Sequence, residues 1–195
     1  MKVVIIAGGK GTRIASLNSE IPKAMIPING KPVLEYQIEL AKRYGHTDIF
    51  LVIGYLGDKI RSYFGNGESF GVQIKYFEEH SPLGTAGALA ELRNVLTEDF
   101  FLFYGDTVMD VALDKMYAFH TIQQADATLF LHPNDHPYDS DLVEIDKKGV
   151  IIGFHSKPHP KNFLYRNLVN AALYILSPRL LLHIPQGIRS EESRV

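Results

Sequence analysis

The sequence predicts an α/β protein with a mostly parallel sheet, and two observations support this expectation. Apolar, strand-like runs alternate with amphipathic, helix-like stretches over residues 1–122, which is the pattern of successive β-α-β units. After residue 126, strand-like segments follow one another with only loops or turns between them. We therefore expect a Rossmann-like, three-layer α/β/α fold with antiparallel strands added to a parallel sheet.

The first half of the chain supplies the parallel part. Lys2–Ala7 is a continuous apolar run, which is typical of a strand buried on both faces. Pro32 opens a helical stretch in which Leu34 and Ile38 fall on one face, and Gly45 ends it. The other expected elements are strands at 48–55, 72–79 and 100–106, and helices at 57–65, 84–96 and 112–122.

The second half supplies the antiparallel additions. Strands are expected at 127–132, 141–146, 150–156 and 169–176. The turn Lys147-Lys148-Gly149 predicts a hairpin between the second and the third of them.

Composition excludes several classes of protein. The chain has no cysteine, which rules out disulfides, thiolate catalysis and thiolate zinc sites. A net charge of −2 without a basic stripe argues against a nucleic-acid partner. The N-terminus lacks a leader pattern, and no apolar run approaches the roughly 20 residues of a membrane span. We expect a cytoplasmic protein that does not contact membranes.

The loop A-G-G-K-G-T-R (7–13) follows the first strand, at the edge of the sheet where ligands bind. It lacks the third glycine of the dinucleotide fingerprint, and the chain has no G-K-[ST] of the ATPase type. Its glycines, Arg13 and the later Lys23 are nevertheless groups that bind phosphate. These residues alone are equally compatible with a tight turn that carries two surface cations.

The loop does not stand alone. Together with Pro22 and Lys23 it matches the pattern G-G-x-G-T-R…P-K, which resembles the signature of the sugar-1-phosphate nucleotidyltransferases. The resemblance continues through K-P-V-L-E-Y-Q-I-E (31–39), P-L-G-T-A-G-A-L (82–89), Gly105-Asp106, Ser156-Lys157-Pro158 and Val169-Asn170-Ala171-Ala172, and so covers essentially the whole chain. Within this family, the chain most resembles the bacterial mannose-1-phosphate and heptose-1-phosphate guanylyltransferases.

The resemblance implies a nucleotidyltransferase fold and reaction. A nucleoside monophosphate would pass from a nucleoside triphosphate, here GTP, to a mannose- or heptose-type sugar 1-phosphate, with release of pyrophosphate. It also implies a Mg²⁺ cofactor and permits a homodimer. Residues 1–195 would form a single domain, with a nucleotide-binding part at 1–131 and a sugar-binding part at 132–195.

The resemblance also implies roles for individual residues. Arg13, Lys23 and Asp106 would be catalytic, and Asp106 would ligate the metal. The residues expected to bind the nucleotide are Ala7, Gly8, Gly9, Gly11, Thr12, Arg13, Lys23, Gly84, Thr85, Ala86 and Gly87. Asp141, Lys157 and Asn170 would bind the sugar phosphate. Asp110 is a second metal candidate, although a role as the cap of the next helix is favoured.

Several positions depart from the family pattern. Ser140-Asp141 replaces Tyr-Gly, Ser156 replaces glutamate and Ala172 replaces glycine, all on the sugar side. Ala24 stands where thymidylyltransferases carry a glutamine, which argues against dTTP but leaves GTP, UTP and CTP open.

Family domains usually continue to a late aspartate, the second metal ligand, which this chain does not reach before Val195. We therefore expect a C-terminally shortened form. A uridylyltransferase and an inactive nucleotide-binding module remain the alternatives.

Overall fold

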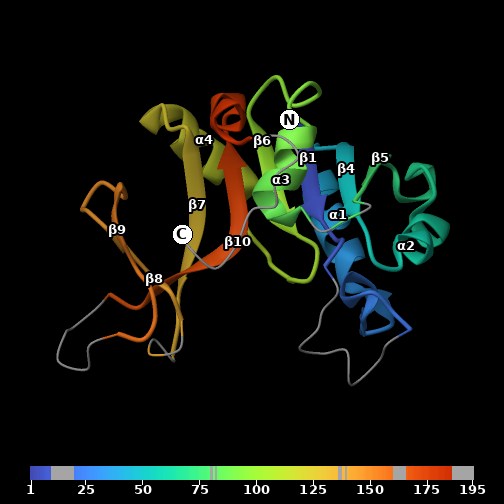
Figure 1. Cartoon of the computed structure of the whole chain (residues 1–195), viewed down its shortest axis with the longest axis horizontal. Helices are drawn as coiled ribbons and strands as arrows, with labels where there is room; N and C mark the ends of the chain where they lie inside the picture. Colours follow the sequence, from blue (N-terminus) through green and yellow to red (C-terminus); the bar gives the residue numbers. More distant parts are fainter. Residues whose placement is uncertain are drawn as a thin grey trace.

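The computed structural model of the chain describes residues 1–9, 20–79, 81, 83–135, 138, 140–159 and 166–185. A six-stranded sheet forms its centre, in the order β5-β4-β1-β6-β10-β7 (Figure 1). Its strands are β1 (Val3–Ile6), β4 (Asp48–Ile53), β5 (Gln73–Glu78), β6 (Phe100–Tyr104), β7 (Ala127–Pro133) and β10 (Leu168–Leu176). β1, β4, β5 and β6 are parallel, whereas β10 is antiparallel to both β6 and β7. The expected mixed, mostly parallel sheet is confirmed.

Helices cover both faces of this sheet. They are α1 (Val33–Arg43), α2 (Gly57–Phe64), α3 (Gly84–Glu91) and α4 (Leu113–Gln123), with short 3₁₀ turns η1 (Lys23–Met25), η2 (Glu68–Phe70) and η4 (Pro178–His183). Side chains of α1, α2 and α4 pack on one face, and those of α3 and η4 pack on the other. This arrangement is the three-layer α/β/α architecture that the sequence predicts.

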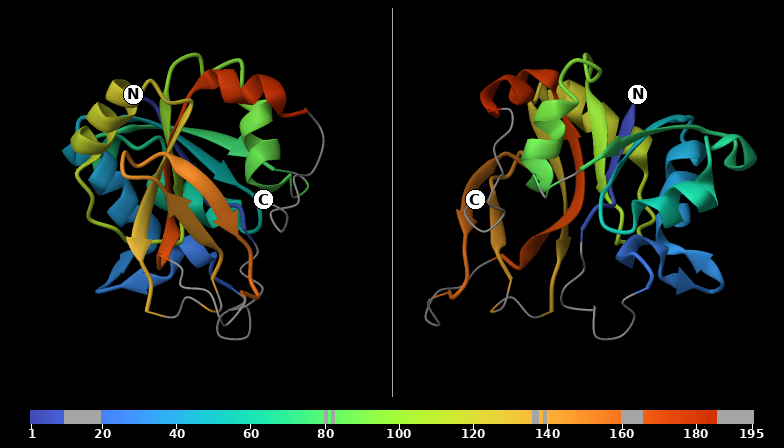
Figure 2. Two further views of the ribbon diagram at one scale, coloured as in Figure 1. Left: turned by 90° about the vertical axis from the view of Figure 1, so that its left-hand side faces the viewer. Right: turned by 45° about the vertical axis from the view of Figure 1, so that its right-hand side comes forward.

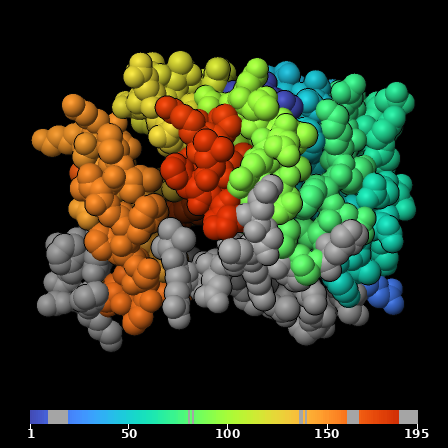
Figure 3. All heavy atoms as spheres, turned by 45° about the horizontal axis from the view of Figure 1, so that its top comes forward, coloured from blue at the N-terminus to red at the C-terminus, as the bar shows by residue number. Residues whose placement is uncertain are grey.

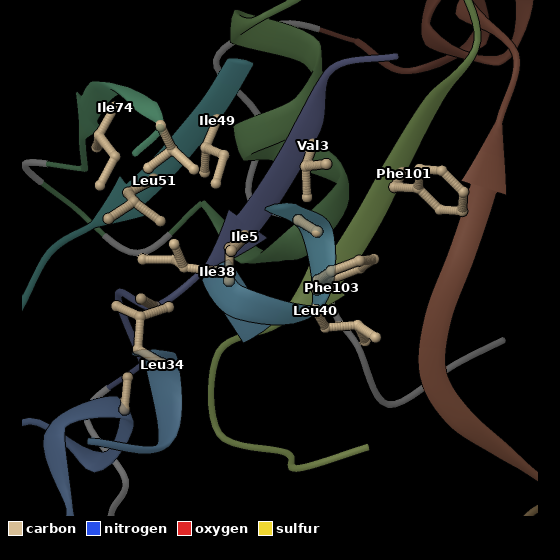
Figure 4. Close-up of a cluster of buried hydrophobic side chains, with 14 of the residues drawn as sticks. Val3, Ile5, Leu34, Ile38, Leu40, Ile49, Leu51, Ile74, Phe101 and Phe103 are labelled. Atoms are coloured by element: carbon tan, nitrogen blue, oxygen red, sulfur yellow. The ribbon is translucent and has the colours of Figure 1, made fainter. Parts of the chain in front are cut away.

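The central strands are apolar on both sides because both sides are covered. Along β6, Phe100 and Leu102 face the layer of α3, whereas Phe101 and Phe103 face the layer of α1. All four are at most 2% exposed. Figure 4 shows the α1 side, where aliphatic side chains of β1, β4 and α1 meet the two phenylalanines. This core fixes the strand ends on which the functional residues lie.

One expected helix is shorter than predicted. α3 ends at Glu91 rather than near residue 96. The carbonyl of Leu92 accepts from both Val95 N and Leu96 N, each at 3.0 Å, so the regular helical ladder stops in a tight turn. Leu96 remains fully buried, which is why the apolar periodicity ran past the true end.

The second half of the chain is divided between two places. β10 lies inside the main sheet, between β6 and β7. β8 (Leu142–Ile145) and β9 (Ile151–His155) instead form a hairpin that stands apart from the sheet (Figure 2). Asp146 Oδ1 accepts from Lys148 N at 2.8 Å and from Val150 N at 2.9 Å, and Gly149 has a φ of 82°. The predicted hairpin turn is confirmed.

A further pair of two-residue strands, β2 (Pro27–Ile28) and β3 (Lys31–Pro32), leads into α1.

A groove of about 530 Å³ lies between the hairpin and the layer of α4 and β7, lined mainly by apolar side chains such as Phe119, Leu129 and Val150. Figure 3 shows the hollow beside the hairpin. Within the described ranges, no helix is long and apolar enough to span a membrane.

Candidate active site

The candidate site lies at the carboxyl edge of the parallel strands, toward the lower side of Figure 1. From β1 the chain proceeds through α1 and α2 to β4 and β5 on one side. It then crosses through α3 to β6 on the other side of β1. The strand order therefore reverses between β1 and β6, and ligands of open α/β sheets generally bind outside the carboxyl ends of the strands at such a point.

Glycines lie at the ends of three adjacent strands at this edge, with Gly8 after β1, Gly54 after β4 and Gly105 after β6. A Cβ at Gly8 would lie 2.7 Å from Glu79 Oε2 and 3.1 Å from Gly54 N. A Cβ at Gly105 would lie 3.1 Å from Ile6 O. Such distances leave no space for a side chain without displacing backbone. Glycine at these positions therefore lets the ends of the three strands pack closely against one another and against Glu79.

Lys23 and Asp106 meet at this edge although 83 positions separate them in the chain. Lys23 Nζ donates to Asp106 Oδ2 in an ion pair, and the two side chains are 36% and 31% exposed. Lys23 comes from η1, and Asp106 follows β6 after Gly105. The structure thus brings together the two described residues that the resemblance marks as catalytic.

The segment expected to contact base and ribose also reaches this edge. Gly84 begins α3 with a φ of 69°, and Thr85 follows it. Thr85 Oγ1 lies 2.7 Å from the hydroxyl of Tyr104, the last residue of β6. The start of α3, with Ala86 and the buried Gly87, therefore lies beside the strand that carries Asp106.

Glu79 is a site residue that the sequence reasoning missed. It follows β5 directly, and its Oε1 accepts from Leu83 N at 3.1 Å, which ties its carboxylate to the entry of α3. Its Oε2 lies against Gly8, as the contact distance of a Cβ there indicates. An acidic residue at the end of a predicted strand was the available signal.

Gln37 is a second missed residue. It is 1% exposed, and the two N–H groups of its Nε2 lie within hydrogen-bonding distance of Tyr104 O, Thr107 O and Thr107 Oγ1, on either side of Asp106. Its signal was also present, since position 37 falls on the apolar face of α1 with Leu34. A polar residue on a buried face indicates a specific hydrogen-bonding role.

The residues predicted to bind the sugar phosphate lie in two places: Asp141 and Lys157 flank the β8–β9 hairpin, and Asn170 lies on β10. Lys157 N donates to Asp141 Oδ1 at 3.0 Å, so these two residues lie together. Asn170 lies on β10, where its Oδ1 accepts from Ala172 N at 3.0 Å and its Nδ2 donates to the Tyr174 hydroxyl. A bulge between Asn170 and Tyr174 shifts the register of β10 against β7, and bulges often redirect side chains at functional sites.

Two substituted positions on the sugar side have visible consequences. Ser140 Oγ accepts from Asn134 Nδ2 at 2.6 Å, and Ser140 O accepts from the buried His159 Nε2 at 2.6 Å. The bond to His159 uses the main-chain carbonyl of residue 140, so only the contact with Asn134 depends on the serine side chain. Ala172 adopts a φ of 58°, the left-handed conformation that favours the glycine usual in the family.

Asp110 does not have the role favoured from the sequence. It forms an ion pair with Arg43 at 2.7 Å, with its side chain 84% exposed, and α4 begins three residues later with Ala112 as its N-cap. The prediction that Asp110 caps α4 is therefore wrong.

Gly11, Thr12 and Arg13 lie outside the described residues, whereas Ala7, Gly8 and Gly9 follow β1 as expected.

The chain matches the family described as nucleotidyl transferase over residues 2–194. It belongs to this family. It is 34% identical to a UTP–glucose-1-phosphate uridylyltransferase of Synechocystis, over 96% of this chain and 52% of that protein. It is 33% identical to the D-glycero-alpha-D-manno-heptose 1-phosphate guanylyltransferase of Campylobacter jejuni, over 91% of this chain and 76% of that protein.

Solved structures of the family share the fold. HddC from Yersinia pseudotuberculosis, complexed with GMP-PN, superposes with a TM-score of 0.80 at 26% identity, covering 96% of this chain and 81% of that one. The chain spans about half the length of the Synechocystis relative and about three quarters of the Campylobacter one. The family is thus that of the sugar-1-phosphate nucleotidyltransferases, and its members named here differ in nucleotide and in sugar.

Proposed function

We propose that this chain transfers guanylate from GTP to a mannose- or heptose-type sugar 1-phosphate. The observation that carries the proposal is the pairing of Lys23 with Asp106 at the carboxyl edge of the strands, where closely packed glycines end β1 and β6. A cation and a carboxylate are groups that a triphosphate and its metal ion require. No protein nucleophile is needed, because the sugar phosphate itself attacks.

In the proposed reaction, an oxygen of the sugar 1-phosphate forms a bond to the α-phosphorus. The bond from that phosphorus to the oxygen that bridges to the β-phosphate breaks, and this oxygen leaves with pyrophosphate. Lys23 holds the α-phosphate and the attacking phosphate together and offsets their mutual repulsion. Arg13, which lies outside the described residues, is assigned to the departing pyrophosphate by the family resemblance alone.

Asp106 fits the role of a magnesium ligand. Mg²⁺ is commonly held by one or two carboxylates, with substrate phosphates and water completing its shell. Within the described part of the chain, no three His, Cys, Asp or Glu side chains gather at a metal position. In our proposal, Asp106 would hold Mg²⁺ jointly with the triphosphate. When bound, the ion would neutralise the charge that develops on the phosphate oxygens.

Glu79 supports the assignment of guanine. Glu79 Oε2 lies against Gly8, so a nucleoside bound over Gly8 and Gly54 would meet the Glu79 carboxylate. A carboxylate accepts hydrogen bonds and does not donate them. Guanine alone among the common bases offers it two adjacent donors, N1–H and the N2 amino group. Uracil and thymine would place carbonyl oxygens beside it.

The experiment that tests the function is a panel of GTP, UTP, CTP, dTTP and ATP. Each is combined with Mg²⁺ and with mannose 1-phosphate, glucose 1-phosphate or a heptose 1-phosphate, and pyrophosphate release is measured. We expect release with GTP and a mannose- or heptose-type acceptor. Turnover with UTP alone would instead support the uridylyltransferase alternative. Thermal stabilisation by a nucleotide without any turnover would support a binding module.

The Glu79→Gln variant tests the choice of base. An amide presents a donor and an acceptor where the carboxylate presents only acceptors, so the preference for GTP over UTP should fall by about 10- to 100-fold. Glu78→Gln is the matched control, because Glu78 belongs to β5 and pairs with Arg61 at 3.3 Å. An unchanged GTP preference in Glu79→Gln would remove the role given to Glu79.

Cytoplasmic location and homodimerisation stay predictions of the sequence.

A further inference from the structure

We propose that Gln37 is the positioning residue that holds the Asp106 carboxylate in place for metal and nucleotide. The inference rests on the proposed function and adds to it a residue that does not touch substrate. Gln37 belongs to α1, whereas Asp106 belongs to the loop after β6, so no local sequence signal links them.

The side-chain amide of Gln37 joins both ends of the segment that carries Asp106. Nε2 lies 2.5 Å from Tyr104 O, 2.6 Å from Thr107 O and 2.9 Å from Thr107 Oγ1. All three neighbours can accept, which fixes the nitrogen on this side of the amide. Thr107 Oγ1 in turn donates to Tyr104 O at 3.0 Å. Asp106 thus lies in a short loop whose two ends are fastened to one donor.

The burial of Gln37 makes this clamp rigid. The residue is 1% exposed and lies among the apolar side chains by which α1 packs on the sheet. Its Oε1 is buried without a hydrogen-bond partner among the described residues. An unpaired buried acceptor costs free energy. An aliphatic residue would avoid that cost, so the amide at this position is best explained by what its N–H groups hold.

The clamp matters because the Asp106 carboxylate is itself half-exposed and paired with the flexible Lys23. Lysine can follow a moving carboxylate, since its ammonium sits on a long, rotatable stem. A magnesium ion that bridges protein and triphosphate demands near-ideal geometry. The hydrogen bonds of Gln37 hold the backbone on either side of Asp106 in place, which the flexible side chain of Lys23 cannot do.

The test uses Gln37→Met, which keeps the length and packing of the side chain and removes its donors. Amide hydrogen exchange by mass spectrometry follows residues 104–110, and titration of GTP with and without Mg²⁺ follows metal-dependent binding. We expect exchange in this segment to become at least about tenfold faster, with the β1 and β4 segments unchanged. The gain in GTP affinity that Mg²⁺ provides should fall by a similar factor.

The matched control is Thr128→Val, which also removes a buried hydrogen bond. Thr128 Oγ1 lies 2.8 Å from His120 Nδ1, at the start of β7 and hence at the edge of the sheet away from Asp106. This variant should lower the melting temperature without altering exchange at 104–110 or the Mg²⁺ effect. Thr107→Val weakens the same clamp from its other side. Combined with Gln37→Met, its effects on exchange should not add, because one network is lost in both.

The outcomes separate the two proposals. Unchanged exchange at 104–110 in both clamp variants would overturn the role of Gln37, whatever the protein binds. Faster exchange with an undiminished Mg²⁺ effect would overturn it too, since Asp106 would then need no fixed loop. A wild-type chain that binds no nucleotide would contradict the proposed function. The exchange measurement would still decide whether Gln37 holds the segment around Asp106.

Discussion

Replacement of Asp106 by asparagine is the sharpest single test of the site. The change removes one negative charge and keeps the size of the side chain, so the loop after β6 should retain its shape. It leaves Lys23 without its ionic partner and removes the carboxylate that we assign to Mg²⁺. The variant should therefore fold as the wild type does and fail in its chemistry.

The structure sets the size of both effects. Lys23 and Asp106 are 36% and 31% exposed, so water screens their attraction. An ion pair of this kind contributes about 0–1 kcal/mol to stability. In a domain of this length, a loss of that size lowers the melting temperature by no more than about 2–4 °C. Removing a group that stabilises charge in the transition state costs about 10²–10³-fold in turnover.

The assay measures pyrophosphate release with Mg²⁺ and the best substrate pair from the panel, together with the Mg²⁺ dependence of GTP binding. Asp110→Asn is the matched control, because it makes the same chemical change four residues away. Asp110 is 84% exposed and pairs with Arg43 rather than with Lys23, so Asp110→Asn should leave both pyrophosphate release and the Mg²⁺ dependence of GTP binding intact.

Normal turnover by Asp106→Asn would refute the metal assignment. A large fall in the melting temperature would refute the energetic argument, since the pair would then be structural. Equal losses of turnover in Asp106→Asn and Asp110→Asn would show that turnover depends on the total negative charge of this loop and not on a specific role of Asp106.

The remaining predictions concern stability. Ala172 has a φ of 58°, so Ala172→Gly should raise the free energy of unfolding by about 0.5–1 kcal/mol, measured by urea denaturation. The control Ala127→Gly, in an exposed strand position, should lower it by about as much. Burial lowers the pKa of His46, which packs against Phe101, and the positive amino group of Met1 lowers it further. The unfolded state then binds the proton more readily, so stability should fall as the pH drops below about 6.5, and the fall should be smaller in His46→Gln.

Much of the fold follows from local patterns in the chain. The buried strands were recognisable because an apolar run such as Lys2–Ala7 has to be covered on both faces. The turn at Lys147-Lys148-Gly149 was recognisable because Gly149 supplies a positive φ. The α3 boundary was misplaced because Leu96 stays buried after the helix has ended, and periodicity reports burial rather than hydrogen bonding.

The site could be predicted only in part. The positions of Gly8 and Gly9 after the first strand and of Asp106 at the end of a later one were predictable, and the roles of these residues stay predictions. Glu79 and Gln37 were missed, although a carboxylate after β5 and an amide on the buried face of α1 were both visible in the sequence. Their roles depend on Gly8 and on the loop after β6, which are distant in the chain. Asp110 was misassigned for the same reason, since its partner Arg43 lies on another helix.

The sequence by itself determined which segments become buried strands, where the chain turns and which residue types can bind phosphate, because each of these depends on neighbours within a few positions. The tertiary structure decided which of those residues meet. Crossing from β5 to β6 on the far side of β1 places Asp106 against Lys23, between Tyr104 and Thr107, which accept hydrogen bonds from Gln37. Only the order of the strands, set by how the two helical layers pack on the sheet, brings these groups to one edge.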